Sequence, residues 1–234
     1  MASRRGRFYA VSVGPGNPEL LTLQAVRCLE KTKVLAIPVN AGGSRKAYQI
    51  VRGALDFSGK KILELKTAMI KDKEKLKMHH DQQAMQVKAY LDKGEDVAML
   101  TLGDVSVYST AMYLLERLLK MGYEGRMLAG VPSFCAIAAE LGISLTEMDQ
   151  PLHIIPASYG DCREALKLSG TKVFMKSGKR LGALLEEIKE AGLAEQSLLM
   201  ADCGMESQLI CRDIRELEEL PGYFTTVIVK EKEK

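Results

Sequence analysis

The chain has 234 residues, of which 47% are hydrophobic and 27% charged, a composition that supports a folded core. Lys and Arg exceed Asp and Glu by 33 to 30, and this net charge of +3 excludes the basic surface of a typical nucleic-acid-binding domain. No apolar run reaches the roughly 20 residues that span a bilayer, and no signal-peptide pattern follows the first apolar run. We therefore expect a cytoplasmic protein with no nucleic acid and no membrane among its partners.

The first two thirds of the chain alternate short apolar segments with segments of helical spacing. The expected strands are residues 8–13, 34–37, 62–65, 97–102 and 126–128. The expected helices are residues 20–29, a helix whose N-cap is Ser44, residues 72–93, and residues 109–121 followed by Gly122 as a C-terminal glycine. Strands that alternate with helices are parallel and joined by right-handed crossovers, which predicts an α/β sheet.

The last third of the chain is less regular. The expected strands are residues 152–155, 173–175, 198–201, 209–211 and 226–229, and the expected helices are residues 161–168 and 180–190. Residues 203–207 are few enough to form a hairpin, so part of this sheet is antiparallel. We infer an N-terminal α/β domain, residues 1–146, and a C-terminal mixed α+β domain, residues 147–234. The boundary follows an Ala-rich helix that begins near Ser133.

A glycine-rich loop follows the first expected strand. Gly14, Pro15 and Gly16 allow the backbone to approach a ligand, and the next helix directs its N-terminal N–H groups to the same place. The loop lacks the third glycine of the dinucleotide fingerprint and the Lys-Ser/Thr of a nucleotide P-loop. A turn without a ligand is an equal alternative.

Two further loops follow the fourth and fifth expected strands. Asp104, next to Gly103, could meet a ligand with its carboxylate or could only cap the next helix. After the fifth strand come Gly130 and Pro132, and then Ser133, which we expect to be the N-cap of a helix with its hydroxyl in the same crevice. Because ligands of α/β sheets bind at the carboxyl ends of the strands, the three loops are expected to converge.

Cysteines and histidines give no metal signature. The five cysteines are scattered without a CxxC motif, which favours free thiols over a disulfide framework or a zinc site. His79 and His80 are adjacent on an expected helix, so their side chains point about 100° apart and do not easily bind one ion. We predict no metal site, and we expect His153, inside a strand, to be structural.

The loops and several longer segments resemble the tetrapyrrole (corrin/porphyrin) methylase family. Members carry a glycine-proline loop after strand one, a Gly-Asp-Pro turn after strand four and a Pro-Gly-Val-Ser/Thr-Ser turn after strand five. The segments that are similar to the precorrin-2/cobalt-factor II C(20) branch are VAMLTLGDVSVYSTAMYL, GVPSFCAIAAELGISL, HIIPASY, MKSGK, DCGMES and YFTTVIVK, within Phe8 to Lys230. Val105 and Ala129 replace family prolines, which loosens two turns but removes no functional group.

This resemblance implies a two-domain tetrapyrrole methylase-like fold with a ligand cleft between the domains. It implies a homodimeric enzyme of cobalamin (vitamin B12) and porphyrin biosynthesis that uses S-adenosylmethionine as methyl donor. The substrate would be precorrin-2 or cobalt-factor II, methylated at the C(20) meso carbon. Carried over motif by motif, the donor-binding residues are Pro15, Gly103, Asp104, Val107, Pro132, Ser133, Met175, Cys203 or Gly204, and Thr225 or Thr226.

Three side chains are candidates for catalysis. Asp104 could bind or act as base, Lys176 could pair with a substrate carboxylate, and Glu206 lies in the hairpin turn. Further candidate partners for substrate carboxylates are Lys179, Arg180 and Arg45. Each of these charges could instead be solvated. Three other functions stay open: methylation at another position of a corrin precursor, tetrapyrrole binding without catalysis, and a nucleotide-dependent oxidoreductase.

Overall fold

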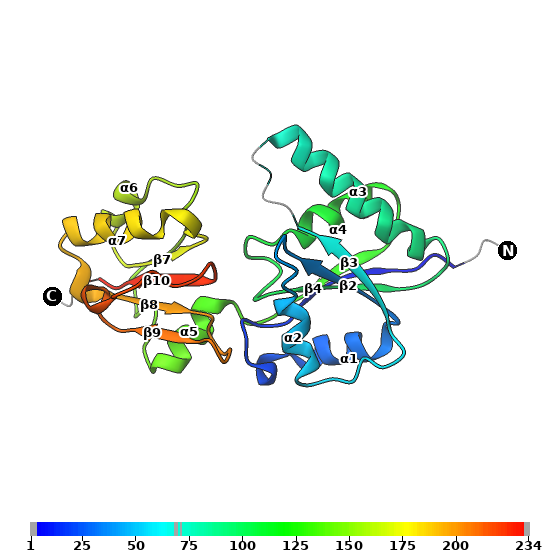
Figure 1. Cartoon of the computed structure of the whole chain (residues 1–234), viewed down its shortest axis with the longest axis horizontal. Helices are drawn as coiled ribbons and strands as arrows, with labels where there is room; N and C mark the ends of the chain where they lie inside the picture. The colour runs from blue at the N-terminus through cyan, green and yellow to red at the C-terminus, as the bar shows by residue number, and fades with distance from the viewer. Residues whose placement is uncertain (1–3, 68–69, 71, 232–234) are drawn as a thin grey trace. The chain divides into compact units, whose positions relative to one another are not determined.

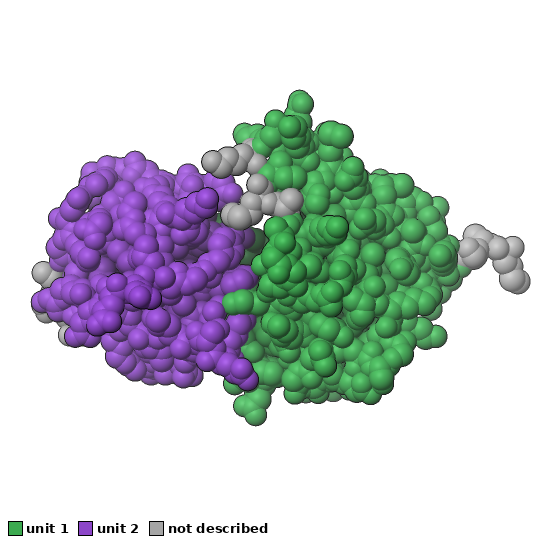
Figure 2. Space-filling view, in the orientation of Figure 1, with its two compact units in different colours: residues 1–132 green, residues 133–234 purple. Residues whose placement is uncertain are grey.

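The computed structural model describes residues 4–67, 70 and 72–231, and the chain divides into two compact units, residues 1–132 and 133–234 (Figures 1 and 2). The division falls earlier than the boundary at 146/147 that the sequence suggested. The reason is helix α5 (Ser133–Leu141), which contacts strand β10 (Thr225–Val229) of the second unit.

The first unit is built on a five-stranded parallel sheet with the order β3-β2-β4-β1-β5. Its strands are β1 (Phe8–Ser12), β2 (Val34–Val39), β3 (Lys61–Lys66), β4 (Val97–Thr101) and β5 (Gly125–Leu128). All five expected strands are present to within two residues. β1 lies between β4 and β5, so the loops that follow these three strands leave one edge of the sheet side by side.

Helices cover the sheet of the first unit. They are α1 (Leu23–Lys31), α2 (Lys46–Arg52), α3 (Lys73–Leu91) and α4 (Ala111–Lys120), with a short 3-10 helix at Pro18–Leu20. Buried residues of α3 and α4 pack on one face, against Phe8 and Ala10 of β1 and Met99 of β4. In Figure 1, α1 and α2 lie on the other face. A parallel sheet covered on both faces explains why its central strands are continuously apolar.

Three expected helix starts in the first unit differ from the structure, and the helix expected from residue 109 begins at Ala111. The first helix begins at Leu23, because the side chain of Thr22 accepts a hydrogen bond from the Ala25 N–H and caps it. Ser44 is not an N-cap: α2 starts at Lys46, and the Ser44 N–H donates to the Asn40 side chain at 2.8 Å. The glycine predicted after α4 is confirmed, since Gly122 has φ +79°.

The second unit contains a mixed five-stranded sheet with the order β6-β7-β10-β8-β9. Its strands are β6 (Leu152–Pro156), β7 (Thr171–Met175), β8 (Ser197–Ala201), β9 (Leu209–Cys211) and β10, defined above. β6 and β7 are parallel, and β7, β10, β8 and β9 pair antiparallel in turn. The hairpin predicted around residues 203–207 is confirmed as the β8–β9 connection.

Helices α6 (Cys162–Leu166) and α7 (Leu181–Glu190) pack on one face of this sheet. Leu184 and Ile188 of α7 are fully buried there with Phe174 of β7 and Val227 of β10. Short 3-10 helices lie at Gly178–Arg180, Ala194–Gln196 and Ile214–Glu216. β10 is buried along its whole length, as expected for the central strand of a covered sheet.

Candidate functional site

The loops after β1 and β4 are joined backbone to backbone. The Gly14 N–H donates to the Gly103 carbonyl at 3.2 Å, and the Gly103 N–H donates to the Gly14 carbonyl at 2.8 Å. Both glycines have a left-handed φ, +73° and +72°, which non-glycine residues adopt only with strain. The predicted convergence of these glycine-bearing loops is confirmed within the first unit.

Asp104 joins the loop after β4 to the loop after β5. Its Oδ2 accepts a hydrogen bond from the Gly130 N–H at 2.6 Å. Its Oδ1 accepts from the Ser106 N–H at 2.8 Å and from the Ser106 hydroxyl. Asp104 is not the cap of α4, which begins at Ala111 with Thr110 as its N-cap. The carboxylate therefore holds two loops together.

The environment of Asp104 favours the ionised carboxylate. The side chain is buried, with 9% of the residue exposed, and burial by itself would raise its pKa. The hydrogen bonds from Ser106 and the Gly130 N–H outweigh that burial and lower the pKa below its ordinary value. At neutral pH both oxygens carry charge and both already accept hydrogen bonds.

Ser12, the last residue of β1, completes this arrangement, and sequence reasoning missed it. Its buried hydroxyl accepts a hydrogen bond from the Val105 N–H at 2.8 Å. A Cβ added to Gly130 would lie 2.3 Å from the Ser12 Cβ, so only glycine fits there. We call Ser12, Asp104 and Gly130 the loop clamp. A serine at the end of a buried strand was the only sequence signal for it.

The first-unit loops leave room for a ligand to approach the backbone. A Cβ added to Gly103 would meet no atom within 4 Å, so space is open beside this turn. Pro15 is buried in the loop after β1, while Val107 and Pro132 are partly exposed. The Gly103 N–H and carbonyl are bonded to Gly14, so the open space lies beside the Cα of this turn.

The candidate residues of the second unit lie at one edge of its sheet. β7 and β8 flank β10 and run in the same direction, so their carboxyl ends lie beside the amino end of β10. Thr225 pairs with Ala201, and the Asp202 N–H donates to the Phe224 carbonyl at 3.0 Å. This edge holds the candidate residues Met175, Lys176, Cys203, Gly204, Thr225 and Thr226.

Two non-glycine residues at this edge have a left-handed backbone. Lys176, directly after β7, has φ +52°, and Asp202, directly after β8, has φ +49°. The Lys176 side chain is half-buried and has no hydrogen bond or ion pair to any of the described residues, and burial lowers its pKa. Strained residues persist where the surrounding structure holds them, and they cluster at functional sites.

The remaining second-unit candidates have different surroundings. Ser133 is the first residue of α5, not its N-cap, and its hydroxyl lies 3.3 Å from the Thr226 hydroxyl. Cys203 is buried, and burial raises the pKa of its thiol to about 11. Gly204 donates its N–H to the Gln208 side chain at 2.6 Å. Glu206 is exposed in the hairpin turn.

Two of the basic residues suggested for substrate carboxylates already have acidic partners. Arg45 pairs with Glu64. Arg180 pairs with Glu187 at 3.0 Å and donates to the Gly160 carbonyl at 3.0 Å. Of the candidates, Lys176 and the exposed Lys179 have no ion pair among the described residues. Lys176 is therefore the stronger of the two, because it is also partly desolvated.

The histidines make contacts of a structural kind. His79 Nε2 lies 2.8 Å from the Lys66 carbonyl, so it donates there, because a carbonyl only accepts. The His80 ring stacks on Tyr113 at 4.8 Å between centroids, and His153 contacts the Ser169 carbonyl. Within residues 4–67, 70 and 72–231, no group of three His, Cys, Asp or Glu could hold a metal, and no helix could cross a membrane. The five cysteines are free.

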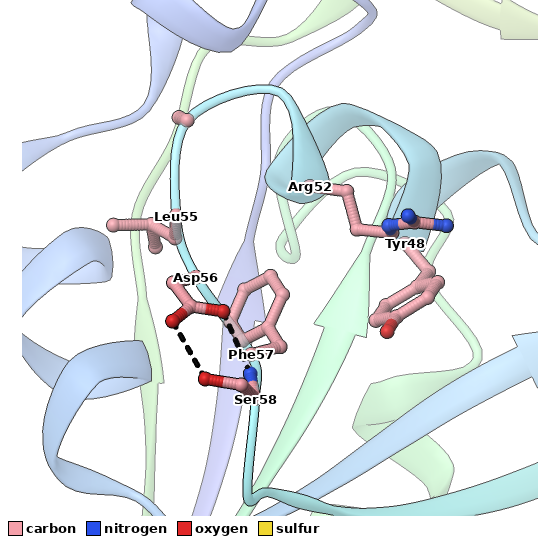
Figure 3. A pocket seen from close by; sticks show the side chains of 7 residues that line it. Tyr48, Arg52, Leu55, Asp56, Phe57 and Ser58 are labelled. Atoms are coloured by element: carbon pink, nitrogen blue, oxygen red, sulfur yellow. Dashed lines mark hydrogen bonds between the residues drawn. The ribbon is translucent and has the colours of Figure 1, made fainter.

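A surface pocket lies on the connection from α2 to β3, not after a strand (Figure 3). Its lining residues are Tyr48, Arg52, Ala54, Leu55, Asp56, Phe57 and Ser58. The Arg52 guanidinium lies 5.8 Å from the Tyr48 ring. Asp56 accepts hydrogen bonds from the N–H and the hydroxyl of Ser58, at 2.8 and 2.6 Å, one on each oxygen. Asp104 forms a similar Asp-x-Ser turn with Ser106, with both hydrogen bonds on Oδ1.

The fold and its loops define a two-unit α/β protein whose candidate binding groups lie at strand ends. The chain belongs to the tetrapyrrole (corrin/porphyrin) methylase family, whose sequence pattern matches residues 7–218. It is 33% identical to a probable cobalt-precorrin-2 C(20)-methyltransferase of Methanocaldococcus jannaschii, and 31% identical to the cobalt-precorrin-2 C(20)-methyltransferase of Salmonella typhimurium. Each alignment covers 96% of both chains.

Solved structures agree with this assignment. A uroporphyrin-III-C-methyltransferase from Thermus thermophilus matches with a TM-score of 0.69 at 25% identity, over 97% of this chain and 95% of that one. A structure of the Thermus enzyme complexed with S-adenosyl homocysteine matches with a TM-score of 0.68 at 21% identity, over 97% and 98% of the two chains. The expected tetrapyrrole methylase fold is thereby confirmed.

Proposed function

We propose that this protein transfers a methyl group from S-adenosylmethionine to the C(20) meso carbon of a precorrin-2-type tetrapyrrole in cobalamin biosynthesis. The observation that carries the proposal is the joining of the glycine-bearing loops at one sheet edge, in a chain similar over 96% of its length to relatives named for this reaction.

The chemistry needs a positioned donor more than it needs an activated protein nucleophile. S-adenosylmethionine supplies a methyl on a sulfonium; the new C–CH₃ bond forms with an electron pair of the meso carbon, and the old S–CH₃ pair stays on sulfur. The meso carbon then loses its proton to water or to a base. Holding two reactants in line can contribute about 7–11 kcal/mol in favourable cases. Backbone groups on rigid loops suit this task.

In the first unit, we assign donor binding to the loops that carry Pro15, Gly103, Val107 and Pro132. Their support is the open space beside Gly103 and the clamp that fixes the loop backbones. In the second unit, we assign donor contacts to Met175, Ser133, Cys203, Gly204, Thr225 and Thr226, following the family resemblance. A protonated Cys203 thiol suits a contact with the apolar part of a nucleoside.

We assign Lys176 to a carboxylate of the tetrapyrrole. Its ammonium group is half-buried with no anionic partner among the described residues, and its backbone is strained. Pairing with a carboxylate would offset the desolvation cost and raise the pKa of Lys176 again. Glu206 stays a weaker candidate, because it is exposed in a turn.

The cobalt-containing substrate is the better candidate of the two. The relatives at 33% and 31% identity are named for cobalt-precorrin-2, whereas a relative from Sinorhizobium at 27% identity is named for precorrin-2. Cobalt would then arrive with the substrate and would need no protein ligand. We also propose that the enzyme is cytoplasmic and that it is a homodimer. Light scattering after gel filtration tests the homodimer directly.

The test is anaerobic incubation with S-adenosylmethionine labelled in its methyl group and with either precorrin-2 or cobalt-factor II. We expect label to enter the tetrapyrrole, with cobalt-factor II as the faster substrate, and NMR to locate it at C(20). Label at another meso or ring carbon would identify an enzyme that methylates a different position of the tetrapyrrole. Binding of both ligands without transfer would identify a binding protein, and absence of S-adenosylmethionine binding would refute the proposal.

A further inference from the structure

Asp104 bridges loops that come from strands which do not touch each other. In the sheet, β1 separates β4 from β5, so the loop after β4 must reach over the end of β1 to meet the loop after β5. The Asp104 carboxylate makes this link through the Gly130 N–H at 2.6 Å. Ser12 also fixes the loop after β4, because its hydroxyl accepts a hydrogen bond from the Val105 N–H at 2.8 Å.

The Asp104 carboxylate is held by backbone and side-chain groups, and a hydrogen bond with the Ser12 side chain also lowers its pKa. Its two oxygens accept from the N–H groups of Ser106 and Gly130 and from the Ser106 hydroxyl. A general base needs a pKa near the operating pH, and this carboxylate has a pKa below its ordinary value although burial opposes that shift. Protonation would weaken the hydrogen bonds that hold two loops, because a neutral carboxyl group is a poorer acceptor than a carboxylate.

We propose that Asp104 and Ser12 are positioning residues, which act through the backbones of the loops after β4 and β5 and thereby set the affinity for the methyl donor. Asp104 is then not the base of the reaction. The inference rests on the proposed function, because it assumes that these loops bind the donor. It adds Ser12 to the functional residues and changes the role of Asp104.

The experiment measures donor affinity separately from chemistry. Titration calorimetry with S-adenosylhomocysteine is carried out on the full chain and on the variants Asp104→Ala, Asp104→Asn and Ser12→Ala. We expect each variant to bind at least about tenfold more weakly, which is a loss of about 1.4 kcal/mol. Asp104→Asn should not rescue binding, because an amide cannot accept from both N–H groups with both of its terminal atoms.

The chain supplies a matched control in Asp56→Ala. Asp56 forms a similar Asp-x-Ser turn with Ser58, with hydrogen bonds of 2.8 and 2.6 Å (Figure 3), and no described residue outside this turn hydrogen-bonds to its carboxylate. Removing it deletes an equivalent local turn without touching the clamp. We expect Asp56→Ala to bind S-adenosylhomocysteine with wild-type affinity. Circular dichroism and thermal unfolding of every variant verify that it is folded.

Kinetics distinguish positioning from proton transfer. For a positioning residue, the variants raise KM for S-adenosylmethionine and keep the shape of the pH profile of kcat. For a base, Asp104→Asn would lower kcat and remove a limb of that profile at unchanged donor affinity, and this outcome would overturn the inference. Ser106→Ala is a milder second variant, since it removes only the hydroxyl donor to Asp104; we expect it to weaken binding less than Asp104→Ala does.

The outcomes also separate this inference from the proposed function. Failure of the wild-type chain to bind S-adenosylhomocysteine or S-adenosylmethionine would refute the function, and the inference with it. Tight binding by the wild type, left unchanged in folded Asp104→Ala and Ser12→Ala, would refute the inference alone. Equal weakening by Asp56→Ala would likewise contradict it, because the effect would then be a general loss of a turn.

Discussion

Gly14 and Gly103 exchange two backbone hydrogen bonds, although 88 residues separate them in the chain, from 14 to 103. Each lies two residues beyond the end of its strand, and each has a left-handed φ. β1 and β4 pair parallel, whereas the bridge between the two glycines is antiparallel, so it is a separate contact between the loops. It joins the loop after β1 to the loop after β4, and the loop clamp joins the loop after β5 to them.

Alanine at Gly103 and at Gly130 should have different costs. At Gly103 the added Cβ meets no atom within 4 Å, so only the left-handed backbone at φ +72° is penalised, by about 1–2 kcal/mol. At Gly130 the added Cβ would lie 2.3 Å from the Ser12 Cβ, so the clamp must open. We expect Gly130→Ala to lower the urea midpoint more than Gly103→Ala. Equal midpoints would contradict this close packing.

Lys176→Gly should stabilise the protein and impair its activity. Glycine tolerates φ +52°, and the change removes a half-buried ammonium group, so stability should rise by up to about 1 kcal/mol. Methyl transfer should fall about tenfold through a higher KM for the tetrapyrrole. The matched control is Met148→Gly, at φ +44° and fully exposed, which should change stability without changing activity. Unchanged kinetics in Lys176→Gly would remove Lys176 from the site.

The clamp should weaken in acid. Because the pKa of Asp104 is lowered on folding, ionised Asp104 contributes stability above its unfolded pKa of about 3.9, and this contribution is lost as pH falls through the folded pKa. The difference in urea midpoint between wild type and Asp104→Ala should therefore be constant from pH 7 to about pH 5 and shrink below about pH 4. A difference that grew in acid would show the opposite sign of the shift.

Cys203 should resist alkylation at neutral pH. Burial raises the pKa of its thiol to about 11, so only about one molecule in a thousand is the reactive thiolate at pH 8. Mass spectrometry after timed iodoacetamide treatment should find the exposed Cys135 modified first. The rate at which iodoacetamide modifies Cys203 should increase as the pH rises toward 11. Fast modification of Cys203 at pH 7 would contradict its burial.

Two threonines should respond to valine with opposite signs. The buried Thr171 hydroxyl has no hydrogen-bond partner among the described residues, so Thr171→Val should stabilise by about 1 kcal/mol. The Thr225 hydroxyl donates to the Gly222 carbonyl at 2.6 Å, so Thr225→Val should destabilise by about 1 kcal/mol. Urea unfolding measures both, and the same sign in both would contradict the assigned bonding.

The regular part of the fold could be predicted from local sequence. Apolar strand segments, the helical spacing of α3 and the glycine after α4 are local signals, and the structure has each of them. Helix starts were less predictable, because Thr22 and Ser44 are equally good caps by residue type. The placement of α5 depended on its packing against β10, which no local pattern contains.

The candidate loops were found by sequence, but their roles were not. Asp56 and Asp104 each begin an Asp-x-Ser turn in which the carboxylate accepts from the N–H and the hydroxyl of the serine. By sequence they are equivalent carboxylates. Only the tertiary structure brings the Gly130 N–H to Asp104 and the Ser12 hydroxyl to the Val105 N–H.

The sequence by itself determined that glycine-bearing turns follow strands and that the chain is similar to the tetrapyrrole methylases. The strand order decided which turns meet, because β1 inserts between β4 and β5 and makes Asp104 reach across it. Hydrogen bonding over such a distance in the chain depends on how strands are ordered in space, and a local pattern carries no record of that order.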